Sequence, residues 1–255
     1  MNRLNGKTAF ITGASSGFGY ECALRLADLG VNLILSGRRF SRLDELKNRL
    51  ISKSIKTEIY VFDVRNSEEV REKIKTILLN NNVDILINSA GLALGANKID
   101  ECNLDDWEEM IDANIKGLLY VSKPIIAHMR KRNSGHVINL GSVAGEITYP
   151  NGNVYCATKA AVKSISEAMN IDLVCTDIRV SNIEPGAALT EFSNVRFKGD
   201  NEKINAVYEG FTPLYAEDIA DLIVYILNAP PHVNIQQTVI MPTAQRNPFV
   251  LARKK

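Results

Sequence analysis

Three residues in the middle of the chain have the types and the spacing of a proton-transfer site. Tyr155 and Lys159 are four positions apart in a segment of helical periodicity, so their side chains should share one helix face. A free tyrosine, with a pKa near ~10, is a poor base at neutral pH, but a nearby lysine ammonium favours the phenolate and lowers that pKa. Ser142 follows a strand-like run and could hydrogen-bond the same substrate oxygen. Together they predict general acid/base catalysis on a hydroxyl group.

A glycine-rich segment near the amino terminus could hold a phosphate group. It follows a strand-like run and precedes a predicted helix. Glycines at such a turn let backbone N–H groups approach a pyrophosphate, and the helix N-terminus favours its charge. Because this is the first strand-to-helix turn of the chain, we expect it to bind a dinucleotide, a purely structural turn being the alternative. The residues concerned are Gly13, Ser15, Ser16, Gly17, Phe18 and Gly19.

Two arginines after the second strand-like run indicate which dinucleotide is bound. Enzymes that bind NAD place an acidic residue there, which holds the ribose 2′-hydroxyl. This chain instead has Arg38 and Arg39. A guanidinium can grip a 2′-phosphate through charge-assisted hydrogen bonds, and the hydroxyl of Ser15 could add another. We therefore expect NADP as the cofactor; alternatively, the arginines are solvated charges at the start of a helix.

The elements that must position these residues alternate along the whole chain. Apolar runs typical of strands buried on both faces occur at 8–12, 31–36, 58–64, 84–90, 136–142, 178–184 and 238–241. Amphipathic segments, such as 42–53, 67–81 and 153–174, lie between them. This alternation predicts a single α/β domain over residues 1–255, with a Rossmann-type doubly wound parallel sheet and helices on both faces. The polar segment 186–213 interrupts it and is expected to be an irregular substrate lid.

The composition excludes several other classes of function. Thirty basic and twenty-nine acidic residues give a net charge of +1, which argues against a nucleic-acid partner. No apolar run approaches the roughly eighteen residues needed to span a membrane, and no signal segment is recognisable. The four cysteines have neither zinc spacing nor disulfide-scaffold density, and the three histidines have no ligand-like spacing. We therefore expect a cytoplasmic protein with no metal site and no membrane contact.

With these motifs in this order, the chain resembles the short-chain dehydrogenases/reductases from end to end. The motifs are TGASSGFG at 12–19, NSAG at 88–91, Asn114, Ser142, Tyr155-x-x-x-Lys159 and the Pro185-Gly186 turn. The resemblance implies that Asn114 is a fourth catalytic residue, which holds a water that relays protons from Lys159. It also implies further cofactor contacts, namely Asp63 and Val64 beside the adenine, Asn88, Ala90 and Gly91 along the cleft, the Pro185-Gly186 turn, and Thr190 at the nicotinamide carboxamide.

Several segments resemble one group of this family, the NADP-dependent 3-hydroxy acid dehydrogenases. They are NSAGLALG (88–95), NIEPG (182–186), TEFSNVRFKGD (190–200) and HVNIQQTVIMP (232–242). The resemblance implies oxidation of L-allo-threonine, L-serine and related 3-hydroxy acids such as 3-hydroxypropionate. It also implies a homotetramer, paired through helices at about 104–131 and 153–174.

The substrate is the part of the prediction with the most alternatives. The carboxylate of a 3-hydroxy acid needs a cation beyond Tyr155, and Arg196 suits bidentate carboxylate binding better than Lys198 does. Alternatively, both cations are solvated, or they pair with Glu191 or Asp200 to order the lid. A general NADPH-dependent ketone or aldehyde reductase would use the same proton-transfer residues. A regulator that only senses the dinucleotide would be expected to lack the tyrosine or the lysine.

Overall fold

The centre of the computed structural model, which describes residues 2–254, is a sheet of seven parallel strands. Their order is β3-β2-β1-β4-β5-β6-β9. They are β1 (Thr8–Thr12), β2 (Asn32–Gly37), β3 (Thr57–Val61), β4 (Ile85–Asn88), β5 (Gly135–Leu140), β6 (Ile178–Pro185) and β9 (Gln237–Ile240). Phe10 and Ile11, adjacent on β1, are both fully buried but belong to different apolar cores, because neighbouring side chains alternate between the two faces. The predicted doubly wound sheet is confirmed.

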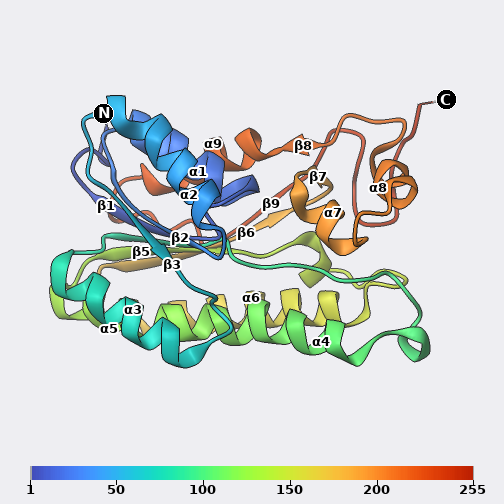
Figure 1. Cartoon of the computed structure of the whole chain (residues 1–255), viewed down its shortest axis with the longest axis horizontal. Coiled ribbons are helices and arrows are strands. Elements are labelled where there is room, and N and C mark those ends of the chain that lie inside the picture. Colours follow the sequence, from blue (N-terminus) through green and yellow to red (C-terminus); the bar gives the residue numbers. More distant parts are fainter. Residues whose placement is uncertain (1, 255) are drawn as a thin grey trace.

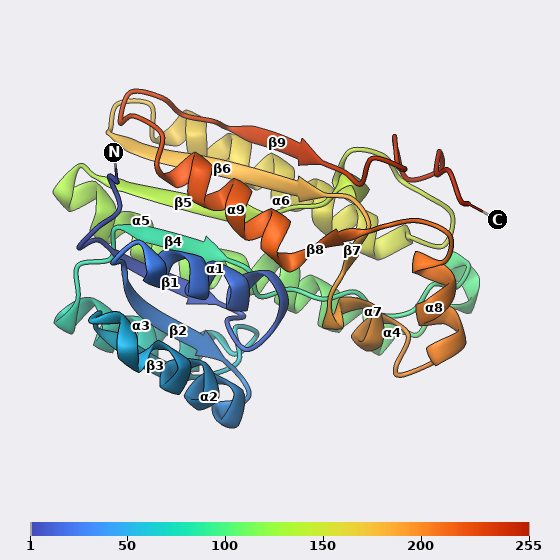
Figure 2. The same ribbon diagram turned by 90° about the horizontal axis from the view of Figure 1, so that it is seen from above.

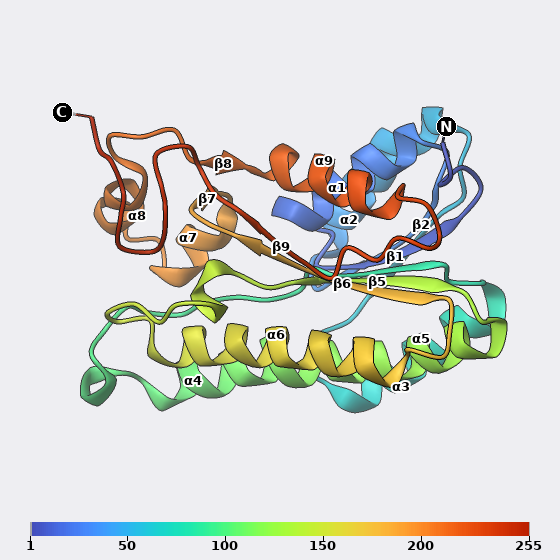
Figure 3. The ribbon, with the colours of Figure 1, turned by 180° about the vertical axis from the view of Figure 1, so that it is seen from behind.

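Helices cover both faces of this sheet (Figures 1 and 3). One face carries α1 (Gly17–Asp28), α2 (Phe40–Leu50) and α9 (Ala216–Leu227). The other carries α3 (Ser67–Asn80), α4 (Leu104–Ile111), α5 (Leu118–Arg132) and α6 (Asn153–Asp172), with a π-helical stretch at Asp112–Gly117 between α4 and α5. Within residues 2–254, none of these helices is both long and apolar enough to cross a membrane.

The order of the strands fixes where a ligand can bind. The chain winds outward in one direction from β1 to β2 and β3, and in the other direction from β4 to β5 and β6. Ligands of such sheets bind in the crevice outside the carboxyl ends of the strands, where the winding reverses. The glycine-rich segment follows β1, the NSAG segment includes the end of β4, and Ser142 follows β5, so all three lie at this edge.

Beyond the carboxyl edge, the chain forms a layer that contains two short helices (Figure 2). We call this layer, residues 186–213, the lid, after the role expected from the sequence. It contains β7 (Ala188–Leu189), α7 (Glu191–Arg196) and α8 (Asn201–Tyr208), and β8 (Leu214–Tyr215) follows and pairs with β7. Our expectation of an irregular loop was therefore wrong. Each lid helix has a side-chain cap: the Thr190 hydroxyl accepts from the Phe192 N–H at 3.2 Å, and Asp200 accepts from the Lys203 N–H at 3.2 Å.

The segment that follows β9, residues 242–254, packs against both ends of the lid. Near the start of the lid, the Gln245 side-chain oxygen accepts a hydrogen bond from the Ala187 N–H at 2.9 Å. Near its end, the Lys254 N–H donates to the Gly210 carbonyl at 2.7 Å, and Arg253 donates to the Val207 carbonyl at 3.3 Å. The carboxyl-terminal segment is thus hydrogen-bonded to the lid at positions more than twenty residues apart.

A buried histidine on β5 gives the fold a pH dependence. His136 is 2% exposed, and its Nε2 is hydrogen-bonded to the Ser181 hydroxyl at 2.9 Å. Burial lowers the pKa of His136 to about 3, and the positive charge of Arg179 adds to this effect.

We expect the free energy of unfolding to fall as the pH falls below the ordinary histidine pKa. Between about pH 6.5 and pH 3 the unfolded chain binds a proton at His136 that the folded chain does not, which favours unfolding. From pH 7 to pH 5 this contribution is about 2 kcal/mol. Denaturant titrations at the two pH values should show a fall that is smaller by about this amount in His136→Gln than in the parent. An unchanged pH dependence in the variant would contradict the assignment.

Candidate active site

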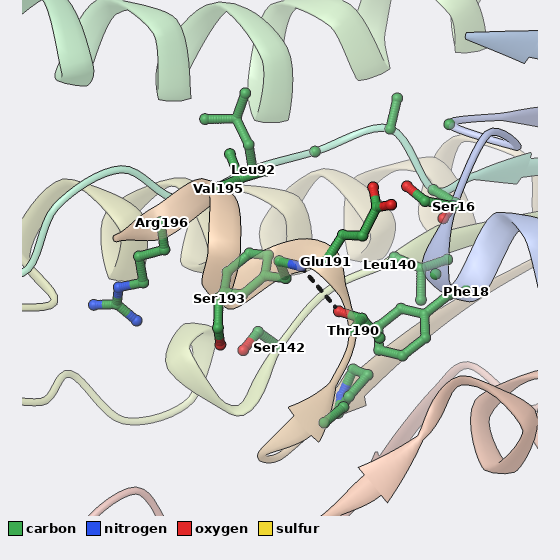
Figure 4. Close-up of a pocket in the computed structure, with 18 of the residues that line it drawn as sticks. Ser16, Phe18, Leu92, Leu140, Ser142, Thr190, Glu191, Ser193, Val195 and Arg196 are labelled. Carbon is green, nitrogen blue, oxygen red and sulfur yellow. Dashed lines mark hydrogen bonds between the residues drawn. The ribbon is translucent and has the colours of Figure 1, made fainter. Parts of the chain in front are cut away.

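A cavity of about 470 Å³ lies at the carboxyl ends of the strands and is bordered by the lid. Figure 4 shows Ser16 and Phe18 of the glycine-rich turn and Glu191 and Arg196 of the lid around it. Most of the residues selected from the sequence line this cavity, although the chain positions that supply them are far apart. They are Gly13, Ser15, Ser16, Gly17, Phe18, Arg38, Arg39, Asp63, Val64, Ala90, Gly91, Ser142, Tyr155, Lys159, Pro185, Gly186, Thr190 and Arg196.

The glycine-rich turn needs its glycines for two different reasons. Gly13 and Gly17 have φ values of 67° and 56°, in the left-handed region that side chains other than glycine rarely adopt. A Cβ atom on Gly13 would also lie 2.8 Å from the Ala90 nitrogen. Gly19 does not line the cavity; a Cβ atom there would lie 2.7 Å from the Gly13 carbonyl oxygen. Gly19 therefore lets α1 pack against the turn, and its expected contact with the cofactor stays a prediction.

Asn88 also differs from its expected position along the cleft. It is 4% exposed and is not among the residues that line the cavity. Its Nδ2 donates to the Asn139 side-chain oxygen at 2.8 Å and to the Ser122 hydroxyl at 2.8 Å. Because β4 and β5 are in register at these two asparagines, Asn88 joins the strands to each other and to α5. It supports the cleft from below and does not form its wall.

The two arginines after β2 occupy one end of the cavity. The Arg38 guanidinium is half-exposed and lies 3.9 Å from Asp63 and 4.0 Å from Glu109. The Arg39 guanidinium donates to the Ser15 hydroxyl at 3.2 Å, to the Ser16 hydroxyl at 2.9 Å and to the Glu191 carboxylate at 2.9 Å. This end of the cavity therefore has two guanidinium groups and a serine hydroxyl, the donors that a 2′-phosphate requires.

The proton-transfer residues meet at the middle of the cavity. Tyr155 and Lys159 share one face of α6, as predicted, and each is 8% exposed. The hydroxyl of Ser142 accepts from the Ala144 N–H at 3.1 Å and lies near enough to Tyr155 to lower the pKa of that phenol. The Lys159 ammonium donates to the Leu140 carbonyl at 2.7 Å, at the last residue of β5. Ser142 and Tyr155 are thus placed to share one substrate oxygen.

Asn114 is buried beside this group, on the π-helical stretch between α4 and α5. Its side chain pairs with the backbone of Leu92 in both directions: Nδ2 donates to the carbonyl and Oδ1 accepts from the N–H, each at 2.8 Å. Nδ2 also donates to the Thr158 hydroxyl at 3.0 Å. A Cβ atom on Gly91 would lie 3.0 Å from the Asn114 oxygen and 3.8 Å from the Lys159 nitrogen, so the two groups lie on one side of that glycine. Asn114 does not line the cavity itself.

Burial dominates the protonation of both central groups. It raises the pKa of the Tyr155 phenol above the ordinary value, and the lowering effects of the Ser142 hydrogen bond and of the Arg196 charge are smaller. It lowers the pKa of Lys159 to about 8. We expected Lys159 to lower the pKa of Tyr155. Its ammonium instead donates to the Leu140 carbonyl, and burial lowers the pKa of Lys159 and so disfavours its charged form. The chain's own groups therefore hold Tyr155 as a neutral phenol.

The lid brings a cation, Arg196, over the ring of Tyr155. The guanidinium of Arg196 lies 5.6 Å from the ring centroids of Tyr155 and Tyr149. It donates to the Gly95 carbonyl at 3.1 Å and to the Tyr149 hydroxyl at 2.9 Å. Among the residues that the structure describes, no carboxylate forms an ion pair with Arg196, whereas Lys198 pairs with Asp106 at 2.9 Å.

Other residues of the cavity wall were not selected from the sequence, among them Tyr149, Phe192, Ser193 and Tyr208. The Phe192 ring centroid lies 5.5 Å from that of Tyr155, and the Ser193 and Tyr208 hydroxyls are 2.6 Å apart. Tyr149 could have been considered, because it lies in the short connection between Ser142 and Tyr155. Within residues 2–254, no cluster of three or more His, Cys, Asp or Glu side chains could hold a metal ion.

Residues 7–201 match the family model described as short chain dehydrogenase. This match, which spans most of the chain, agrees with the sheet order, the glycine-rich turn and the Ser142, Tyr155 and Lys159 arrangement. The chain belongs to the short chain dehydrogenase family, and the resemblance drawn from the sequence is confirmed.

Comparison with individual proteins gives more detailed similarities than the family match does. The chain is 43% identical over 237 residues to the NADP-dependent 3-hydroxy acid dehydrogenase of Salmonella typhi, covering 92% of this chain and 94% of the relative. It is 38% identical to the enzyme of the same description from Schizosaccharomyces pombe, over the full length of both chains. Among solved structures, the closed form of a serine dehydrogenase complexed with NADP+ is 40% identical, with a TM-score of 0.90, covering 97% of this chain and 100% of that structure.

Proposed function

We propose that this protein is an NADP-dependent oxidoreductase that interconverts the hydroxyl of a small 3-hydroxy acid and the corresponding carbonyl. The observation that carries the substrate class is the Arg196 guanidinium, held over Tyr155 by Gly95 and Tyr149 with no ion pair among the described residues. A carboxylate two carbons from the reacting hydroxyl would complete this arrangement, since guanidinium groups bind carboxylates bidentately. The names of the relatives support the same class.

The cofactor end of the cavity fits NADP. The absence of side chains on Gly13 and Gly17 leaves room for a pyrophosphate against the backbone, and Arg38, Arg39 and Ser15 supply donors for a 2′-phosphate. When bound, NADP supplies the hydride acceptor or donor, and the positive ring of its oxidised form favours the Tyr155 phenolate. Thr190, Pro185 and Gly186 at the start of the lid would border the nicotinamide.

The residues of this chain would move the proton. In the oxidative direction, Tyr155 takes the proton of the substrate hydroxyl as the carbon loses its hydride, and Ser142 holds the same oxygen. Burial lowers the pKa of Lys159 to about 8, so its neutral amine is accessible near neutral pH and can take the proton that returns Tyr155 to the phenolate. Asn114 would hold the water through which Lys159 exchanges protons with solvent, a role that rests on the family resemblance.

Removal of the Arg196 cation should affect charged substrates selectively. We expect Arg196→Ala to raise the KM for L-serine or 3-hydroxypropionate about ten- to hundredfold, because a charge-assisted hydrogen-bond pair is lost, while sparing an uncharged secondary alcohol. Steady-state absorbance of NADPH measures this directly. Lys198→Ala is the matched control, since Lys198 is a cation of the same lid that pairs with Asp106 outside the cavity. An equal loss with charged and neutral substrates would mean that Arg196 only shapes the lid.

A general NADPH-dependent ketone or aldehyde reductase is the second candidate. The aromatic wall formed by Tyr149, Phe192 and Phe197 would suit an uncharged substrate as well. The same assay separates the two functions, because such an enzyme would reduce plain ketones at least as well as 3-oxo acids.

We also propose a homotetramer in the cytoplasm. Two helical segments are expected to form the contacts between subunits: one is made of α4 and α5, and the other is α6. They expose large apolar side chains at Leu104, Leu119 and Ile171. Closed symmetric assembly is the commonest arrangement of soluble oligomers. Light scattering at micromolar concentration should therefore give about four times the 28.2 kDa of one chain. An active monomer at that concentration would contradict the proposal.

The cytoplasmic location is supported by the cysteines. Four free cysteines, two of them buried, fit a reducing compartment such as the cytoplasm.

A further inference from the structure

A buried carboxyl group lies close to the catalytic residues but outside the cavity. Glu184, on β6, is fully buried, whereas glutamates are almost never buried without partners. Its Oε1 accepts from the Asn182 side chain at 2.7 Å, and its Oε2 accepts from the Gln237 side chain of β9 at 3.0 Å. It is not among the residues that line the cavity, and the proton-transfer scheme does not use it.

Glu184 supports the residue that precedes Ser142. The pairing of β5 with β6 ends at Leu140 and Ile183, which places Gly141 beside Glu184. A Cβ atom on Gly141 would lie 3.0 Å from the Glu184 Cγ and 2.5 Å from the Asn182 side-chain oxygen. Gly141 therefore rests directly on these two side chains, and a change in the Glu184 side chain would move or loosen it.

The same carboxyl group is linked to the other end of the turn that carries Ser142. In this turn, residues 141–146, the Gly145 N–H donates to the Ser142 carbonyl at 2.8 Å. The carboxylate of Glu146 at its end pairs with Lys163 of α6 at 2.7 Å and accepts from the Gln237 side chain. Gln237 Nε2 thus donates to both Glu146 and Glu184. This one amide therefore links Glu184, which contacts the start of the turn, to Glu146, which lies at its end.

The charges favour a proton shared between the two carboxyl groups. Burial raises the pKa of Glu184, and the neighbouring Glu146 charge and hydrogen bond raise it further. The Lys163 ammonium chiefly lowers the pKa of Glu146, to which Glu184 contributes as a hydrogen-bond partner. Glu184 is therefore the carboxyl group of the pair that binds a proton more readily, and the Lys163 ammonium balances the charge of Glu146.

We propose that Glu184 is a positioning residue for catalysis, which acts with Gln237, Glu146 and Lys163 to fix the Ser142 turn relative to Tyr155. The geometry explains why both ends need support. Lys163 lies one helical turn after Lys159 on α6, so the network ties the turn to the helix that carries the proton-transfer residues. The inference rests on the proposed function, because it assigns Ser142 a part in the reaction.

The test is a set of variants with turnover and cofactor affinity measured separately. We expect Glu184→Ala to lower kcat about tenfold, since a misplaced hydrogen-bond donor loses roughly that factor, while the Kd for NADP changes less than about twofold. Glu184→Gln should recover most of the activity, because its amide can donate to Glu146 and its oxygen can still accept from Asn182, so only the hydrogen bond from Gln237 is lost. If Glu184→Gln were as impaired as Glu184→Ala, or if NADP affinity fell in parallel with kcat, the positioning role would be refuted.

The same substitutions made in a Ser142→Ala variant show whether the loss of turnover depends on Ser142. In Ser142→Ala, the further change Glu184→Ala should cost no additional turnover; an equal tenfold loss in both backgrounds would overturn the inference. Gln237→Ala, at the exposed edge strand, provides the same comparison should Glu184→Ala not fold, and it should show the same dependence on Ser142. A Ser142→Ala variant with unchanged kcat would instead contradict the proposed function itself.

Discussion

Tyr155→Phe should lower the turnover number by roughly two to four orders of magnitude, because the ring is kept and the proton-transferring hydroxyl is lost. The tyrosine hydroxyl lies near Ser142, which lowers its pKa, and no other phenol lies on the same face of α6 beside Lys159 in the described chain. The remaining activity would come from the positioning of substrate and cofactor alone. Steady-state and single-turnover rates of NADPH formation measure the effect.

The cofactor should still bind to the Tyr155→Phe variant with nearly the parent's affinity. Tyr155 is 8% exposed and packs against Phe192, so loss of one hydroxyl leaves the packing of the site in place. Fluorescence titration with NADPH serves as the control for folding. A variant with near-normal turnover would exclude Tyr155 as the acid/base, whereas Tyr149→Phe, which removes a hydroxyl from the same cavity, should leave the proton-transfer step in place.

The choice between NADP and NAD should depend on Arg38 almost as strongly. We expect the parent enzyme to prefer NADP by at least about tenfold in kcat/KM, and Arg38→Asp to weaken NADP about a hundredfold while changing NAD little. Replacing the guanidinium by a carboxylate puts repulsion where attraction held the 2′-phosphate. Arg38 is suited to this role because its ion-pair partners are distant, at 3.9 and 4.0 Å.

Arg39 provides an internal comparison. It already donates to Ser15, Ser16 and Glu191, so a 2′-phosphate would have to share it with the lid. Arg39→Ala should therefore weaken NADP less than Arg38→Asp and should also loosen the lid, which would raise the KM of the acid substrate. Equal use of NADP and NAD by the parent enzyme would refute the assignment of both arginines.

The sheet could be predicted from the sequence because its signal is local. Strands buried on both faces need continuous apolar runs, and the run at 8–12 coincides with β1 (Thr8–Thr12). The proximity of Tyr155 and Lys159 could also be predicted, because both lie on one face of the same helix. The lid helices were missed because both are short and α8 buries none of its residues. Their signal was in the caps, Thr190 and Asp200, each followed closely by a glutamate.

Contacts between distant segments lay beyond what the sequence could indicate. Arg39 and Glu191 are 152 positions apart, and Arg196 and Tyr149 are 47 apart, so only the folded chain brings either pair together. The packing contact of Gly19 and the hydrogen bonds of Asn88 could not be predicted from the sequence for a related reason. Residues adjacent to a binding motif can face the sheet or the helix behind it, and only the three-dimensional structure distinguishes these directions.

The hydrogen bonds between the lid and the carboxyl-terminal segment bear on how substrate preference can be transplanted between relatives. A chimera that exchanges only residues 186–213 would place a foreign lid against Gln245 and Arg253, which bond its backbone at Ala187 and Val207. Exchange of residues 242–254 together with the lid preserves both matched partners. In directed recombination, therefore, these two stretches should be inherited as one block even though the intervening α9 and β9 separate them in the gene.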